Sequence, residues 1–151
     1  MPLSNKPIAR TLIVYYGILQ SLHLLVLARA GVIILLQGRL PFPILPPPGG
    51  WDPQIIPFMI GLGTTDLVGI LLGLFFAYRA LIKGAFYRRL GVISLTIFVT
   101  GAFVFAVGTL PSGAWAAHPI AYGLMAVLFL PAVILYIWLL RSNITRKPTK
   151  K

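Results

Sequence analysis

Residues 55–78 read IIPFMIGLGTTDLVGILLGLFFAY, an apolar run with a single charged residue, Asp66, near its middle. At a rise of about 1.5 Å per residue, about 20 such residues form a helix that crosses the roughly 30 Å of hydrocarbon in a bilayer. Three further runs of similar length and composition lie at approximately residues 11–36, 90–110 and 119–140. The chain is therefore predicted to be an all-α integral membrane protein in which residues 1–151 form a single membrane domain, a four-transmembrane-helix bundle.

The overall composition also favours a membrane protein. Hydrophobic residues make up 58% of the 151-residue chain, charged residues make up 10%, and the mean hydropathy is +0.93. A water-soluble domain of this size exposes roughly a third of its surface to water, which is too much for so apolar a chain. A membrane-spanning barrel would show alternating polarity, whereas these runs are continuous, so we expect helices.

The basic residues indicate how the four spans are oriented. The chain has 13 Lys and Arg residues and two acidic ones, a formal net charge of +11. With four crossings, all the basic residues except Arg29 and Arg39 fall on one side: Lys6, Arg10, Arg79, Lys83, Arg88, Arg89, Arg141, Arg146, Lys147, Lys150 and Lys151. By the positive-inside rule, both termini, including the basic tail 141–151, are predicted to be cytoplasmic.

This charge pattern sets expectations for location and partners. Orientation accounts for the positive charge, so no nucleic-acid partner is expected. Each Lys or Arg close to the bilayer adds about 1 kcal/mol of attraction to anionic lipid headgroups on the cytoplasmic face. We expect a multi-pass protein of the plasma membrane, surrounded by the lipid bilayer and in contact with those headgroups.

A secretory signal is the alternative interpretation of the first span. Lys6 and Arg10 precede an apolar stretch, and the tripeptide Ala-Arg-Ala at residues 28–30 resembles a cleavage site. However, residues 11–27 are long for a signal core, and apolar sequence resumes at residues 32–36. These two features favour a membrane span.

The rare polar residues exclude several kinds of chemistry. The chain has no cysteine, two histidines and two acidic residues, both aspartates, which removes disulfides and thiol catalysis and leaves too few ligands for a metal site. His23 and His118 differ in depth by on the order of 20 Å, too far apart to share one haem iron. No cofactor is evident, although ligation of a haem or pigment by a single histidine remains open.

Residues 37–54 form the predicted Pro-rich outer loop between the first two spans. Its prolines are Pro41, Pro43, Pro46, Pro47, Pro48 and Pro53. Proline this dense stiffens the chain and removes amide donors, which favours an ordered connector over a lid. Asp52 is explained as a helix N-cap followed by a proline in the first turn. The residues that would mark an outer mouth, or an interfacial aromatic belt, are Trp51, His118 and Tyr122.

Small residues repeat every fourth position along the second span. They are Gly61, Thr65, Gly69, Gly73 and Ala77. Small residues with this spacing let another helix approach closely, so we predict a helix-packing face. Because Gly69 and Gly73 lie three and seven positions after Asp66, this face borders the carboxyl group.

Asp66 is the residue whose position most needs a reason. An aspartate at the centre of a spanning helix costs about 2.5–3.5 kcal/mol, so it should face protein or water. Counted from the basic ends of their spans, His23 and Asp66 both lie roughly 18 Å deep. Arg29 lies about 9 Å further out, but its side chain leans toward Asp66 because helical side chains point toward their amino terminus. The candidate ligand or proton site consists of Asp66, His23, Gln20, Tyr16, Arg29 and Thr65.

Three roles for Asp66 are open. In the first, it forms a structural pair with Arg29 or His23. In the second, it is a protonated carboxyl that hydrogen-bonds Thr64 or a neighbouring helix. In the third, it is a working proton or cation site. For His23, a packing residue is favoured over a ligand.

Three functions follow from these features. The first is a non-catalytic subunit or partner-binding module of a larger membrane complex, bound to other membrane-protein chains or to itself, because packing faces are present and reactive groups are few. The second is a proton-linked carrier or binder of a hydrophobic small molecule or lipid that uses Asp66 and His23. The third is a lipid-modifying enzyme in which the same two residues are an acid–base pair.

Overall fold

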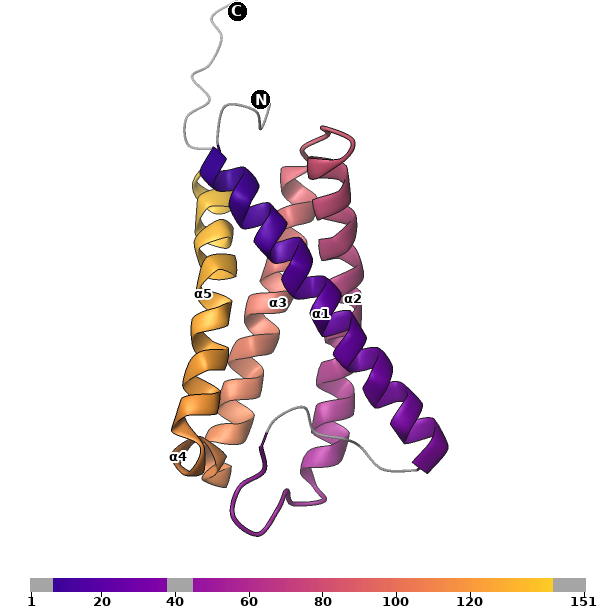
Figure 1. The fold of residues 1–151 in the computed structure, drawn as a ribbon, viewed down its shortest axis with the longest axis vertical. Helices are drawn as coiled ribbons and strands as arrows, with labels where there is room; N and C mark the ends of the chain where they lie inside the picture. Colours follow the sequence, from indigo (N-terminus) through magenta and orange to yellow (C-terminus); the bar gives the residue numbers. More distant parts are fainter. Residues whose placement is uncertain (1–6, 38–44, 143–151) are drawn as a thin grey trace, which may run out of the picture.

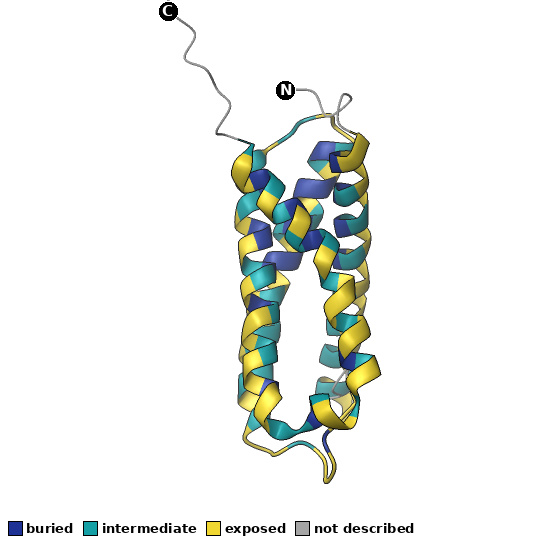
Figure 2. Cartoon of the chain, turned by 90° about the vertical axis from the view of Figure 1, so that its left-hand side faces the viewer, coloured by how far each residue is buried: buried dark blue, intermediate teal, exposed yellow. Residues whose placement is uncertain are grey.

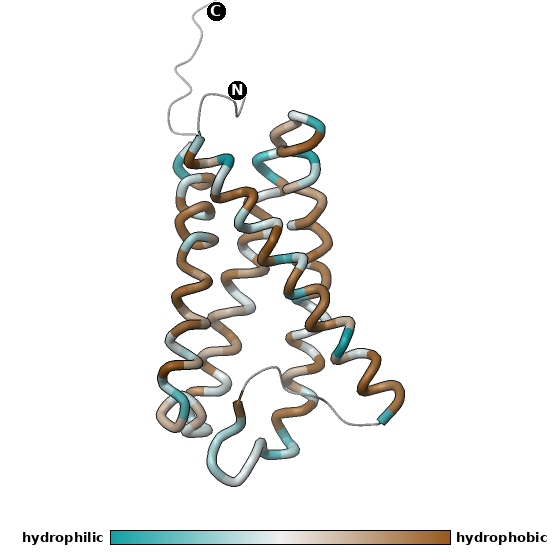
Figure 3. The backbone as a smooth tube through the Cα atoms, in the orientation of Figure 1, coloured by the Kyte–Doolittle hydropathy of each residue, from teal (hydrophilic) through white to brown (hydrophobic). Residues whose placement is uncertain are grey.

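The computed structural model describes residues 7–37 and 45–142, and their secondary structure is entirely helical. The four long helices are α1 (Pro7–Gln37), α2 (Ile55–Leu81), α3 (Arg88–Thr109) and α5 (Pro119–Arg141), with a 3-10 turn (Leu110–Ser112) and the short α4 (Ala114–Ala117) between the last two. By length and composition, all four long helices can cross a membrane, and apolar residues cover most of their length (Figure 3). The prediction of an all-helical fold with four helices of spanning length is confirmed.

The helices are not all parallel. α2, α3 and α5 run side by side, whereas α1 crosses them diagonally, beginning next to the end of α5 and ending beyond α2 (Figure 1). α2 packs against both α1 and α3, and α5 packs against α3 and α1. The second half of α1 therefore moves away from α5 and leaves the bundle on the side of α2 (Figure 1).

The described basic residues, other than Arg29, gather at one end of the bundle. This basic end is formed by the start of α1, the end of α2, the start of α3 and the end of α5 (Figure 1). It carries Arg10, Arg79, Lys83, Arg88, Arg89 and Arg141. The opposite end, called the loop end, is formed by residues 45–54 and α4. Lys6, Arg39 and the basic tail after Ser142 lie outside the described residues, and the cytoplasmic assignment stays a prediction.

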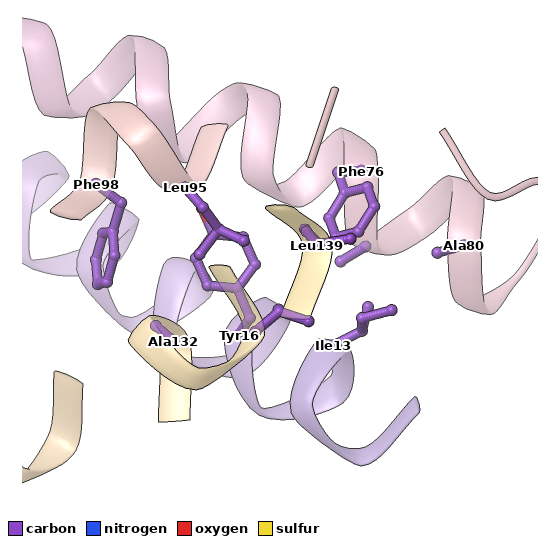
Figure 4. Packing of buried hydrophobic residues seen from close by; sticks show 10 residues of the cluster. Ile13, Tyr16, Phe76, Ala80, Leu95, Phe98, Ala132 and Leu139 are labelled. Carbon is purple, nitrogen blue, oxygen red and sulfur yellow. The ribbon is translucent and has the colours of Figure 1, made fainter. Parts of the chain in front are cut away.

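The buried core lies in the half of the bundle next to the basic end (Figure 2). Its members come from the starts of α1 and α3 and the ends of α2 and α5: Ile13, Tyr16, Phe76, Ala77, Ala80, Leu95, Phe98, Ala132, Leu135 and Leu139 (Figure 4). Rings extend this core, since Phe98 stacks on Phe129 with ring centres 4.8 Å apart and also meets Tyr16 edge-on. The four helices are thus held together mainly at one end.

Only part of the predicted packing face on α2 is covered. Gly69, Gly73 and Ala77 are buried, whereas Gly61 and Thr65 are exposed and Gly61 has no neighbour near its absent Cβ. A Cβ at Gly69 would lie 2.8 Å from Ile97 Cγ2 of α3, so this position accepts only glycine without a shift. The chain's own helices cover the half of this face that is nearer the basic end.

Polar side chains tie helix ends and turns together. Arg88, at the start of α3, donates from Nε to the Leu139 carbonyl at 2.6 Å and from Nη2 to the Leu140 carbonyl at 3.0 Å, satisfying the last turn of α5. Midway along α5, the Leu128 carbonyl accepts a 2.7 Å hydrogen bond from the Tyr15 hydroxyl of α1.

The start of α2 differs from the sequence prediction. The helix begins at Ile55, with Gln54 in the N-cap position, so Asp52 is not the N-cap and Pro53 does not lie in the first turn. Asp52 Oδ1 instead accepts the Gln54 amide at 2.8 Å, and its carbonyl accepts the Ile55 amide at 2.9 Å. The aspartate still has a local role, which is to organise the turn that leads into α2.

We predict that Arg88→Ala lowers the free energy of unfolding by about 2 kcal/mol, because the last carbonyls of α5 lose a charged donor. Thermal or denaturant unfolding in a fixed detergent, followed by circular dichroism, measures this change. Arg89→Ala is the matched control, since it removes the same charge from an exposed neighbouring side chain. Equal effects of the two substitutions would contradict the assignment.

Candidate functional site

α1 and α2 bring an imidazole and a carboxyl group together. His23 Nε2 of α1 lies 3.8 Å from Asp66 Oδ2 of α2. This is within ion-pair range but beyond a hydrogen bond, and the pair is charged on both sides only when the imidazole is protonated. The side chains remain 28% and 16% exposed, so neither is sealed inside the protein.

α3 approaches Asp66 through a glycine. A Cβ at Gly101, which is buried, would lie only 2.5 Å from Asp66 Oδ1. The carboxyl group therefore occupies the space that a side chain at this position would fill. The sequence marks Gly101 only as a small residue on the third span, and nothing in its local pattern indicates that it faces the acid.

The other predicted partners of Asp66 are engaged elsewhere or lie apart. The Thr64 and Thr65 hydroxyls donate to carbonyls one turn back in their own helix, at 2.8 and 3.1 Å, rather than to the carboxyl. Arg29 is exposed and forms no ion pair with Asp66. The Arg29 pair expected from helix geometry is not found among the described residues, in which Asp66 meets His23 instead.

The polar stripe on α1 faces inward next to this pair. Tyr16 and Gln20 are fully buried, and the Tyr16 hydroxyl hydrogen-bonds Ser94 Oγ of α3 at 2.5 Å. Both oxygens converge on Gly73, where a Cβ would meet Tyr16 Oη at 2.9 Å and Ser94 Oγ at 3.0 Å. Ser94 was not predicted as part of the site, since its only signal in the sequence is its small size on the third span.

The Gln20 amide is buried next to Tyr16. Its side chain has 0% exposure, and among the described residues neither Oε1 nor Nε2 has a partner at full hydrogen-bond geometry, although the Tyr16 side chain interacts with it. An unpaired amide inside a protein costs about 1–3 kcal/mol, so such groups usually meet an ordered water or a ligand. Gln20 lies one turn of α1 from His23, and Phe98 contacts the rings of both Tyr16 and His23.

The residues predicted for an outer mouth hold the loop in place. His118 Nε2 donates to the Pro46 carbonyl and the Tyr122 hydroxyl donates to the Leu45 carbonyl, each at 3.0 Å. Trp115 stacks on Tyr122, while Trp51 is partly buried in the same loop. These contacts fasten residues 45–54 to the start of α5, and a role at a mouth stays a prediction.

The arrangement limits the chemistry that the site can perform. Within residues 7–37 and 45–142, no group of three or more His, Cys, Asp or Glu side chains could hold a metal ion. The Ser94 hydroxyl is paired with Tyr16, and His23 and Asp66 are too far apart to share a hydrogen-bonded proton. At this separation the pair is suited to exchanging a proton or attracting charge.

Comparison of the chain with protein-family models, with curated proteins and with solved structures found no match. The fold and the site therefore define the class of protein by themselves. Over the residues that the structure describes, it is a helical protein with four helices that can cross a membrane and a carboxyl–imidazole pair between the first two of them.

We predict that Gly101→Ala destabilises the fold by about 1–2 kcal/mol, because the new methyl group displaces the Asp66 carboxyl. Gly123→Ala is the control, since a Cβ there meets nothing within 4 Å. In a double-mutant cycle measured by unfolding, Asp66→Ala should relieve most of the cost of Gly101→Ala. Additive effects would show that the carboxyl is not the group displaced.

Proposed function

We propose that the protein is a non-catalytic, partner-binding subunit of a larger membrane complex. The observation that carries this proposal is the half-covered packing face on α2. Gly69, Gly73 and Ala77 are buried by α1 and α3, but Gly61 and Thr65 continue the same small-residue spacing on an exposed surface. A spanning helix of another chain fits such a surface, because small residues allow the backbones to approach closely.

The course of α1 supports the same proposal. The end of α1 lies away from the other helices (Figure 1), and apolar side chains there, for example Leu35 and Leu36, are largely exposed. Arg29, in the second half of α1, is exposed and has no ion pair within residues 7–37 and 45–142. Lipid can cover the apolar side chains, and by the depth count the Arg29 guanidinium lies near the far edge of the hydrocarbon, where lipid headgroups or a polar group of a partner chain can satisfy it.

The proposal includes a location. The protein is placed in the plasma membrane with the basic end in the cytoplasm, where exposed Lys83 and Arg89 meet anionic headgroups. The grouping of Arg10, Arg79 and Arg141 at this same end supports that orientation.

We predict that, in native nanodiscs extracted from cells without detergent, the 16.5-kDa chain is bound to at least one further protein chain, so that the protein assembly released from the particles exceeds the mass of one chain. Gly61→Leu should reduce this assembled fraction severalfold, because the larger side chain fills the uncovered packing face. Gly123→Leu, at an exposed position on α5, should leave it unchanged. Native mass spectrometry of the particles measures both, and a wild type present only as single chains would contradict the proposal.

A second function is favoured by the His23–Asp66 pair, namely a proton-linked carrier or binder of a hydrophobic small molecule. The pair is the only ion pair within the part of the chain that the structure describes, and both side chains keep some exposure. Ionisable groups at this depth in a spanning helix are costly and are usually retained for function.

We predict that the Asp66 carboxyl exchanges its proton in protein reconstituted into vesicles. Infrared spectra should show a carboxyl band that changes with pH and shifts in heavy water, that is lost in Asp66→Asn and that persists in Asp52→Asn. Asp52 is the matched control because it is the other acidic residue and lies in the exposed loop. A carboxyl band that responds to neither pH nor heavy water would contradict the second function.

A further inference from the structure

The turn between α2 and α3 has a defined backbone and lies at the basic end of the bundle (Figure 1). The Lys83 amide donates to the Tyr78 carbonyl at 3.4 Å. Gly84 follows with a φ of 62°, which glycine adopts without strain, and the chain reverses there. The Ala85 amide then donates to the Arg79 carbonyl at 2.9 Å. The basic side chains at this turn therefore project from fixed positions.

Two of these basic side chains are held against tyrosine rings. Arg79 Nη2 donates to the Tyr87 hydroxyl at 2.6 Å, and its guanidinium carbon lies 4.9 Å from the centre of the same ring. Lys83 Nζ lies 5.8 Å from the centre of the Tyr78 ring. Among the described residues, Arg79 Nη1 and Lys83 Nζ donate to no protein acceptor. Tyr87 accepts from Arg79 and keeps its own hydroxyl hydrogen, so these three side chains offer donors to a ligand.

The protein provides no negative charge at this turn. Its two acidic side chains lie elsewhere, Asp52 in the loop at the opposite end and Asp66 midway along α2. The stretch from Arg79 to Arg89 carries four basic side chains, of which only Arg88 is occupied by the last carbonyls of α5. Clustered like charges repel one another and attract external anions. The counter-charge for this turn therefore comes from outside the chain.

The surface that leads to these cations is apolar. Along α2, exposed side chains follow one another at spacings of four, three and four, which places them on one face of the helix. This apolar stripe consists of Leu71, Phe75, Tyr78 and Ile82. Ile82, next to Lys83, is 70% exposed. A ligand that covers both the cations and the stripe has an anionic headgroup and a hydrocarbon chain.

We propose that this end of α2 is a binding site for one anionic phospholipid. Its phosphate binds Arg79 and Lys83 and accepts the hydroxyl hydrogen of Tyr87, while an acyl chain lies along the apolar stripe. This goes beyond a general attraction to headgroups, because donors at fixed positions select one lipid. The inference rests on the membrane location proposed above, but on neither of the two proposed functions.

Other anions and lipids fit this surface less well. Inorganic phosphate or a soluble nucleotide would satisfy the cations but leave the apolar stripe uncovered. A zwitterionic lipid also has a phosphate, but its own ammonium group weakens the attraction to Arg79 and Lys83. The site is therefore expected to distinguish phosphatidylglycerol from phosphatidylcholine with the same acyl chains.

The test is native mass spectrometry of the purified full-length protein in a non-ionic detergent, titrated with either of these two lipids. The first phosphatidylglycerol should bind about tenfold more tightly than phosphatidylcholine. Lys83→Gln should weaken that binding about tenfold, whereas Arg141→Gln, which removes the same charge from α5, should change it by less than about twofold. Tyr87→Phe should weaken it about threefold without any change in charge. Tyr136→Phe is the matched control, since the Tyr136 hydroxyl bonds Thr96 instead.

Equal effects of Lys83→Gln and Arg141→Gln, or no effect of Tyr87→Phe, would show a diffuse attraction and overturn the site. Displacement of the first lipid by inorganic phosphate at a similar concentration would overturn it too, because the apolar stripe would then contribute nothing. Arg79→Gln should match Lys83→Gln. If Arg79→Gln does not fold, the other two variants decide. The partner-binding function is tested separately by Gly61→Leu, so failure of the lipid site leaves that function standing.

Discussion

The closeness with which α2 approaches both of its neighbours is the constraint on which the rest of the structure depends. At Gly69 and Gly73 there is no room for a Cβ beside the side chains of α1 and α3. Where helices meet this closely, dispersion contacts hold them together, and between spanning helices they replace the hydrophobic effect that operates in water. The core forms around these glycines, and nearer the loop end α2 and α3 stay in close contact, since a Cβ at Gly108 would lie 2.6 Å from Phe58 Cζ.

The same close approach determines which polar groups meet. Because α1 lies against Gly73, its Tyr16 hydroxyl reaches Ser94 on α3 without an intervening side chain. Because α3 presents a glycine to Asp66, the carboxyl packs against backbone and obtains no donor from a neighbouring side chain. Packing therefore brings the Tyr16 and Ser94 hydroxyls into a hydrogen bond with each other. It leaves the Asp66 carboxyl near the His23 imidazole but beyond hydrogen-bond distance.

Much of the fold was predictable because membrane-spanning helices are recognised from continuous apolar length, which is a local property. The small-residue spacing on the second span likewise predicted a packing face. Inward placement of Gln20 followed from its spacing with Tyr16, and the equal depth of His23 and Asp66 followed from the rise per residue.

The parts that the sequence did not predict depend on how helices cross. Depth counting assumes straight, parallel helices, and with that assumption Arg29 would have leaned toward Asp66. α1 instead crosses the other helices diagonally (Figure 1), Arg29 forms no ion pair with Asp66 among the described residues, and Gly61 and Thr65 are exposed. Similarly, Gly101 and Ser94 belong to the site only because of the rotation of α3, and neither residue carries a local signal for it.

α1 lies close to α2 at Gly17, where a Cβ on the glycine would lie 3.2 Å from the Ala77 methyl. A change in the tilt of α1 about this contact would move its two ends by unequal distances. From Gly17 to Gln37, the helix extends about 30 Å beyond this contact. A rotation of about 10° around it displaces the far end by about 5 Å but moves His23, less than two turns away, by only about 1.5 Å. A change in the tilt of α1 would thus move its loop end several times further than it moves His23. A small displacement at the carboxyl–imidazole pair would accordingly correspond to a large one at the loop end.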